Sequence, residues 1–144
     1  MTQTILDTAT AFLKEKGFLE RIYVDEKIAD RFIELFVAEA EKITAGAPGA
    51  GNYGPATMPE QIDVIASHIA DALKRGSKAL LGGKKSVQPP YVQPVVLVDV
   101  PEDAIAMTEE TFGPVAAGPF PGAAPTPPSN LGRSANCYLP RQSR

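Results

Sequence analysis

The sequence contains one cysteine, Cys137, and one histidine, His68, and both residue types can act as a nucleophile or a metal ligand. A catalytic thiol needs a lowered pKa and a rigid site that stabilises an oxyanion. Cys137 lies among arginine, serine and proline residues that supply neither, so we predict no catalytic residue there. His68 lies in mid-helix, off the isoleucine stripe, with no acidic or cysteine partner at ligand spacing. We predict a surface or boundary residue and no metal site.

Two glycine-rich stretches could in principle hold a phosphate. Residues 49–54 spell G-x-G-x-x-G, and residues 82–85 read Gly-Gly-Lys-Lys. A dinucleotide loop must follow a strand and open a helix, whereas the first stretch follows a predicted helix and precedes Pro55. The second lacks the P-loop spacing and the Ser or Thr after its first lysine. We therefore predict a flexible connection and a hairpin turn with solvated lysines.

The composition excludes several classes of partner. A net charge of −3 over 144 residues gives no basic surface for nucleic acid or for an anionic membrane. No apolar stretch approaches the roughly 18 residues that a membrane span needs. One cysteine rules out an internal disulfide, and no secretory signal is visible. We expect a cytoplasmic protein with neither a nucleic-acid nor a membrane partner.

The apolar periodicity predicts an α/β order of elements. We expect a short helix in 1–18, a strand at 21–24, a helix at 25–44 capped by Asp25, a second helix from a capping box at 57–60 to Gly76, a strand at 78–81 and a strong strand at 93–100. Crossovers of this length favour parallel pairing, with helices on the faces of the sheet.

The C-terminal part of the sequence has a different character. Residues 116–144 hold six of the 14 prolines, three arginines and no acidic residue, and they show no periodicity. Such a segment buries too little apolar surface to offset its ordering entropy, so we predict a disordered tail. The predicted organisation is a helical leader at 1–18, one domain at 19–115 and this tail.

A cluster of two acids, an aromatic residue and a Gly-Pro turn occupies residues 109–114, just after the apolar strand Tyr91–Val100. This Glu-Glu-Thr-Phe-Gly-Pro sequence resembles the E-E-x-F-G-P motif of aldehyde dehydrogenases. Further agreements with that family follow in order from about Leu19 to Val115: Arg21-Ile-Tyr-Val24, the helix 25–44, Gly54-Pro55, Ala72-Leu-Lys-Arg-Gly76, Leu81-Gly-Gly83 and the strand 91–100, in which Val95 replaces the usual threonine.

The resemblance implies part of an aldehyde dehydrogenase catalytic domain, with a mostly parallel sheet and flanking helices. It implies oxidation of an aldehyde to an acid with NAD or NADP, through a cysteine thiolate and a glutamate-activated water. Carried over to this chain, Glu110 would bond the nicotinamide-ribose hydroxyls and Phe112 would pack near the nicotinamide ring. Plain core packing is the alternative for Phe112, and Glu109 is interpreted as a neighbour of the ligand site.

The sequence departs from the family at the reacting residues. The family's cysteine lies five residues before the position of Arg21, where this chain has Lys16, and residues 10–18 contain no Gly-Gln-x-Cys pattern. Sequence for the dinucleotide fold and the water-activating glutamate is absent as well. We expect a truncated or degenerate member that binds no NAD or NADP and shows no activity alone. Two alternatives stay open: a non-catalytic module that docks on a full-length dehydrogenase subunit, and the product of a frameshifted or split gene.

Overall fold

A computed structural model describes residues 6–7, 10–11, 13–14, 19–118 and 137–138. Its main sheet has the order β2-β5-β6-β1-β7, and a separate two-stranded sheet joins β3 to β4. The strands are β1 Leu19–Tyr23, β2 Lys78–Leu81, β3 Val87–Gln88, β4 Tyr91–Val92, β5 Val95–Val98, β6 Pro114–Ala117 and β7 Cys137–Tyr138. The helices are α2 Glu26–Ala40, α3 Pro59–Lys74 and α4 Ile105–Thr108, with a 3₁₀ turn at Lys84–Ser86. The predicted α/β class is confirmed.

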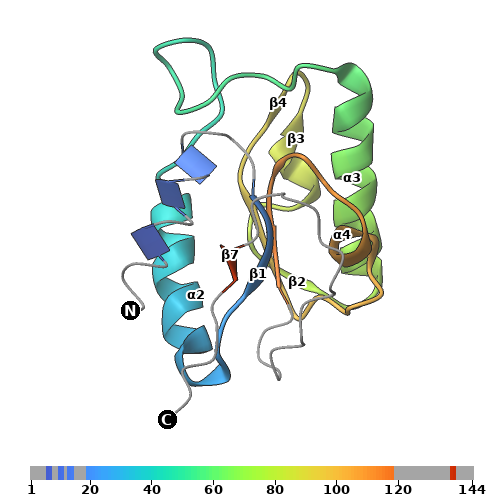
Figure 1. Ribbon diagram of the computed structural model, residues 1–144. Helices are drawn as coiled ribbons and strands as arrows, with labels where there is room; N and C mark the ends of the chain where they lie inside the picture. Colours follow the sequence, from blue (N-terminus) through green and yellow to red (C-terminus); the bar gives the residue numbers. More distant parts are fainter. Residues whose placement is uncertain (1–5, 8–9, 12, 15–18, 119–136, 139–144) are drawn as a thin grey trace.

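The sheet lies between two helical layers, with α2 on one face and α3 and α4 on the other (Figure 1). Strand β5 is apolar throughout because both of its faces are buried. Val96 and Val98 join the cluster under α2, whereas Val95 and Leu97 join the cluster under α3. Successive side chains of a strand point to opposite faces, so a strand covered on both faces is apolar throughout.

Helix α2 begins where the sequence predicts. The Asp25 side chain accepts a hydrogen bond from the Lys27 N–H at 2.9 Å, as an N-cap residue should. Phe32 and Phe36 lie one turn apart on its buried face, and their rings stack with centroids 5.7 Å apart. The helix ends at Ala40 instead of continuing to Gly46.

Helix α3 begins without the predicted capping box. Its N-cap residue is Met58, which makes no side-chain cap, and Pro59 occupies the first turn. The proline alone suits this position because it has no N–H to satisfy and its φ is already helical. The helix stops just before Gly76, as predicted; this glycine has φ +98°.

The strand pairing is only partly as predicted. Strand β6 pairs in parallel with both β1 and β5, whereas β2 pairs with β5 in the antiparallel sense. Between β2 and β5 the chain makes the 3₁₀ turn and the β3–β4 hairpin instead of crossing the sheet in a helix, so it returns in the opposite direction. Pro94, which lacks an N–H, separates β4 from β5 where the sequence predicted one strand.

Two predicted boundaries change. Ala116 and Ala117 belong to β6 and are buried, so the disordered tail cannot begin at residue 116. Cys137–Tyr138 forms a short parallel strand beside β1, while residues 119–136 and 139–144 lie outside the described residues. In the predicted leader the described residues 6–7, 10–11 and 13–14 are helical, and the rest of 1–18 lies outside them. Among the described helices none is long and apolar enough to cross a membrane.

Candidate functional site

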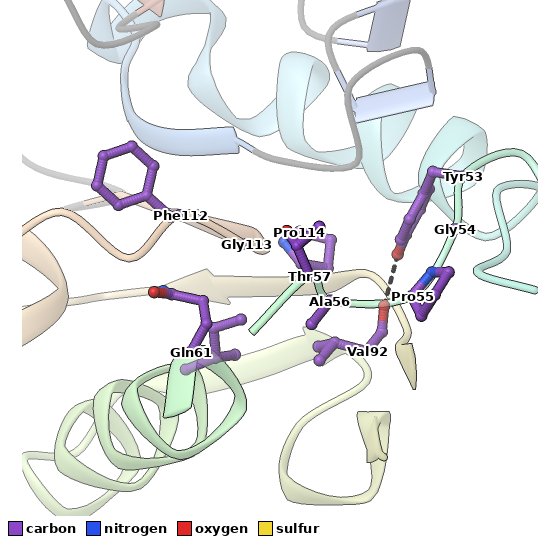
Figure 2. A pocket seen from close by; sticks show the side chains of 11 residues that line it. Tyr53, Gly54, Pro55, Ala56, Thr57, Gln61, Val92, Phe112, Gly113 and Pro114 are labelled. Atoms are coloured by element: carbon purple, nitrogen blue, oxygen red, sulfur yellow. Dashed lines mark hydrogen bonds between the residues drawn. The ribbon is translucent and has the colours of Figure 1, made fainter. Parts of the chain in front are cut away.

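A pocket of about 310 Å³ opens where β5 and β6 begin, beside the start of α3. Three segments form most of it: residues 53–57 of the α2–α3 connection, Gln61 and Ile65 of α3, and residues 112–114. Val92 of β4 completes the lining. Figure 2 shows Phe112 and Tyr53 on opposite sides of this pocket. Strand β1 also begins at this edge of the sheet, because its Leu19 is in register with Pro114.

The segment 109–113 is attached to one face of α3. Thr111 points inward and is buried; its carbonyl accepts a hydrogen bond from Gln61 Nε2 at 2.5 Å, and its Oγ1 lies 2.9 Å from His68 Nδ1. The His68 Nε2 lies 3.8 Å from a carboxylate oxygen of Glu109. The backbone of Gly113 packs on Ile65. Because positions 61, 65 and 68 recur with the helical period, all of these contacts lie along one stripe of α3.

The same helix also holds the start of α4. The Ile105 N–H donates to Asp71 Oδ2 at 2.9 Å, and Arg75 Nε donates to Asp71 Oδ1 at 3.0 Å. The backbone hydrogen bond, followed by the Arg75 guanidinium, keeps the pKa of the Asp71 carboxyl below its usual value. Arg75 Nη1 also donates to Asp103 Oδ2 at 2.9 Å. Residues on both sides of α4 therefore contact side chains of α3 and its C-cap: Asp103 before α4, and Glu109 and Thr111 after it.

Tyr53 forms the opposite wall of the pocket. Its hydroxyl donates to the Val92 carbonyl at 2.7 Å, the bond drawn in Figure 2. Burial raises the pKa of the Tyr53 phenol well above its ordinary value, so this group remains a neutral donor. The residues lining the pocket include no acidic or basic side chain.

The α2–α3 connection around Tyr53 is an ordered loop. Gln93 Oε1 accepts from the Ala45 N–H at 2.9 Å, and its Nε2 donates to the Ala45 carbonyl at 3.1 Å. A Cβ on Gly51 would stand 2.4 Å from the Gly46 nitrogen, so the two chain segments touch here. The stretch 49–54 is therefore a connection, as predicted, and the Gln93 side chain holds it at Ala45. It follows α2 and does not open a helix directly, so it has no dinucleotide-loop geometry.

Comparison with known proteins decides the family. The sequence model described as "Aldehyde dehydrogenase family" matches residues 18–117, which is more than half of the chain. The chain belongs to the aldehyde dehydrogenase family. The matched range contains β1 to β6 and helices α2, α3 and α4.

Individual dehydrogenases support this membership. Over 103 residues the chain is 38% identical to the hydroxyisobutyraldehyde dehydrogenase of Mycolicibacterium austroafricanum, a match over 67% of this chain and 20% of that protein. It is 38% identical over 100 residues to the NADP(+) succinate-semialdehyde dehydrogenase GabD of Escherichia coli K12, with the same coverage. A solved indole-3-acetaldehyde dehydrogenase in complex with NAD+ is 26% identical, with a TM-score of 0.71 over 82% of this chain and 26% of that one. The chain thus spans about a fifth of the length of the curated dehydrogenases it matches.

The two residues that the aldehyde dehydrogenase motif singles out lie differently. Phe112 lines the pocket and is 56% exposed. Its backbone has a left-handed φ of +46°, which residues other than glycine seldom adopt. Its exposure argues against plain core packing. Glu110 is exposed and does not line the pocket. Roles for Glu110 and Phe112 toward a cofactor stay predictions.

His68 corrects the sequence interpretation. It was predicted at the surface or boundary, but it is only 2% exposed and touches Thr111. His68 lies beside Ile65, at the margin of the isoleucine stripe, where segment 109–113 covers the helix. That contact joins residues 43 positions apart, so helical periodicity carries no sign of it. Gln61 and Thr111 were missed for the same reason.

The remaining candidate groups lie apart from the pocket. Cys137 of β7 is in register with Ile22 of β1. Strand β7 therefore lies on the opposite side of β1 from β6, the strand that Phe112 precedes. Lys84 and Lys85 are exposed, as predicted, but they lie in the 3₁₀ turn that follows β2 and not in a hairpin turn. Within the described ranges no three His, Cys, Asp or Glu residues gather as a metal site would require. Lys16, which the resemblance places at the position of the family's cysteine, lies outside the described residues.

Proposed function

We propose that this chain supplies the part of an aldehyde dehydrogenase catalytic domain that receives the nicotinamide end of NAD or NADP, and that it oxidises no aldehyde alone. The observation that carries the proposal is the exposed Phe112 on the wall of a pocket, within the family's own sequence motif. When bound, NAD(P) would accept the hydride of the oxidation.

The pocket suits one end of a dinucleotide. Its volume of about 310 Å³ is at the low end of the roughly 300–1,000 Å³ found for ligand pockets. None of the described side chains that line it is charged, so none of them would neutralise a pyrophosphate. An uncharged wall with one aromatic side chain is compatible with a flat ring. The residues present therefore support nicotinamide binding and do not support tight binding of the whole coenzyme.

Phe112 and Glu110 offer complementary chemistry to such a ligand. The oxidised nicotinamide ring carries positive charge, and the face of an aromatic side chain attracts a cation. A carboxylate accepts hydrogen bonds from two neighbouring hydroxyls, so the exposed Glu110 could bond a ribose at the rim. Phe112 would orient the ring, and Glu110 would fix the sugar.

The reacting groups of the family have no counterpart that supports catalysis here. The family's cysteine position corresponds to Lys16, and Cys137 is the only cysteine in the 144 residues. A lysine ammonium does not form the thioester through which the family's reaction passes. Loss of a catalytic nucleophile alone lowers kcat by several orders of magnitude. Inactivity of the isolated chain is therefore part of the proposal.

Ligand-observed NMR tests the binding half of the proposal. The sequence alone predicts no coenzyme binding by the isolated chain, whereas the pocket leads us to propose weak binding. Nicotinamide mononucleotide, the nicotinamide–ribose half of the coenzyme, should receive saturation from the protein at its ring protons, with a Kd of about 1 mM. AMP, the other half, should receive none. Because a cation–π contact contributes about 1 kcal/mol at an exposed site, Phe112→Ala should weaken binding about fivefold. Gln88→Ala, an exposed change outside the pocket, should leave binding unchanged.

Two results would contradict this assignment. One is a Kd for nicotinamide mononucleotide that Phe112→Ala leaves unchanged. The other is NAD+ binding tenfold or more tighter than nicotinamide mononucleotide, because that would require a partner for the adenosine half. Equal affinities for NAD+ and nicotinamide mononucleotide would support the proposal.

A second candidate function is association with a full-length dehydrogenase subunit. Among the described strands β2 lies at the edge of the sheet, and its Leu80 is 45% exposed. An open edge with an exposed apolar residue can pair with another chain. Co-expression with an intact aldehyde dehydrogenase and retention of this chain on the tagged enzyme would support association, and a Leu80→Lys variant should weaken it. We propose a cytoplasmic location for both functions, where Cys137 would stay reduced, and cell fractionation tests this.

A further inference from the structure

We propose that His68 is a positioning residue: through Thr111 it holds segment 109–113 in the conformation that presents Phe112 to the pocket. The role assigned to Phe112 rests on the proposed function. The attachment itself rests on geometry alone, because His68 and Thr111 are both 2% exposed and their polar atoms lie 2.9 Å apart.

The surroundings of His68 determine which ring nitrogen carries the proton. A neutral imidazole has one N–H donor and one acceptor nitrogen. Nε2 faces the Glu109 carboxylate at 3.8 Å, and a carboxylate only accepts. The favoured form therefore has its hydrogen on Nε2. Nδ1 is then the acceptor, and the Thr111 hydroxyl donates to it.

This hydrogen bond acts on Phe112 through the backbone. Thr111 and Phe112 are neighbours, yet one side chain is buried and the other is 56% exposed. The turn between them requires the left-handed φ of +46° at Phe112, a strained conformation that persists only where the surrounding contacts impose it. On the inner side Gln61 holds the Thr111 carbonyl and His68 its hydroxyl. Release of the hydroxyl would remove one of the contacts that keep Thr111 inward.

A histidine that merely fills the core is the competing explanation. It predicts that His68 substitutions lower stability and leave the mobility of residue 112 unchanged. The positioning role predicts a change in mobility that depends on the Nδ1 hydrogen bond. The two explanations separate in a measurement at position 112 itself.

The experiment uses Phe112→Trp as the background, because the chain contains no other tryptophan. His68→Leu and Thr111→Val each remove one partner of the hydrogen bond, and Val keeps the shape of Thr. Both should lower the fluorescence anisotropy of the indole and increase its quenching by acrylamide, in the absence of any cofactor. His68→Asn keeps a polar atom near the Nδ1 position and should recover part of the lost anisotropy. Phe36→Leu, in the separate core under α2, should destabilise the protein and leave both readouts unchanged.

The proposal is overturned if His68→Leu and Thr111→Val fold and leave anisotropy and quenching unchanged, or if Phe36→Leu changes them equally. A measurement on the unmodified chain guards against variants that do not fold. Since His68 is the only histidine, a long-range ¹H–¹⁵N spectrum reports its tautomer directly. The Nε2–H form supports donation from the Thr111 hydroxyl to Nδ1, and the Nδ1–H form refutes that direction of the hydrogen bond. Nicotinamide mononucleotide could fail to bind while indole anisotropy and acrylamide quenching change as described. That result would refute the proposed function and leave the positioning role of His68 intact.

Discussion

Gly113 lies directly against Ile65: a Cβ added to Gly113 would stand 2.6 Å from Ile65 Cδ1 and 2.9 Å from its Cγ1. Ile65 is buried in the core between α3 and the sheet, so it has little room to move aside. The glycine of the aldehyde dehydrogenase motif is therefore explained by packing. It lets the chain pass over α3 at van der Waals distance just before β6 begins.

Gly113→Ala should consequently destabilise the protein. Overpacking a buried contact costs about 1–3 kcal/mol, so the midpoint of chemical denaturation should fall. Gly54→Ala is the matched control, because Gly54 is exposed and a Cβ there meets no atom within 4 Å. Equal stability of the two variants would show that Ile65 and Gly113 are not in tight contact.

Gln93→Ala should loosen the connection between α2 and α3. The change removes both hydrogen bonds to Ala45 and leaves that residue's backbone groups without this partner, at a cost of about 1–3 kcal/mol. Amide hydrogen exchange should rise in residues 44–53 specifically. Gln88→Ala, which loses only a local bond to the Lys85 carbonyl, should change neither stability nor exchange in that loop. Unaltered protection of residues 44–53 in Gln93→Ala would contradict the assignment.

Asp71 should contribute stability that depends on pH. The Ile105 N–H and Arg75 lower the pKa of its carboxyl in the folded state relative to the unfolded state. The contribution is therefore complete above the unfolded pKa and is lost as the pH falls through the folded pKa. The Tm difference between wild type and Asp71→Asn should be largest near neutral pH and should shrink in acid. Asp63→Asn, an exposed change on the same helix, should show no such trend. A Tm difference that is constant or grows toward low pH would refute this role.

Local sequence signals predicted the elements well. The Asp25 cap and the spacing of Phe32 and Phe36 define α2, and the unbroken apolar run defines β5. These signals involve residues within a few turns of one another, where propensity and periodicity decide. Phe112, which the family resemblance singled out, lines the pocket, and its role toward a cofactor stays a prediction.

What the sequence could not predict depends on contacts between distant residues. The burial of His68 results from segment 109–113 folding over α3, and no pattern within α3 contains that information. Antiparallel pairing of β2 follows from the hairpin that replaces a helical crossover. Tyr53 reaches the pocket because Gln93 fixes the loop that carries it. In each case tertiary contacts override a local interpretation.

We propose that this chain keeps the family's nicotinamide-facing scaffold without a nucleophile placed to attack an aldehyde. The most direct test is an assay of NAD(P)H formation by the purified chain with short aldehydes and NAD+ or NADP+, beside a full-length aldehyde dehydrogenase as the positive control. We predict no rate above the protein-free blank with either coenzyme. A rate above the blank that Cys137→Ser abolishes would contradict the claim, because it would show that Cys137 serves as the reacting thiol.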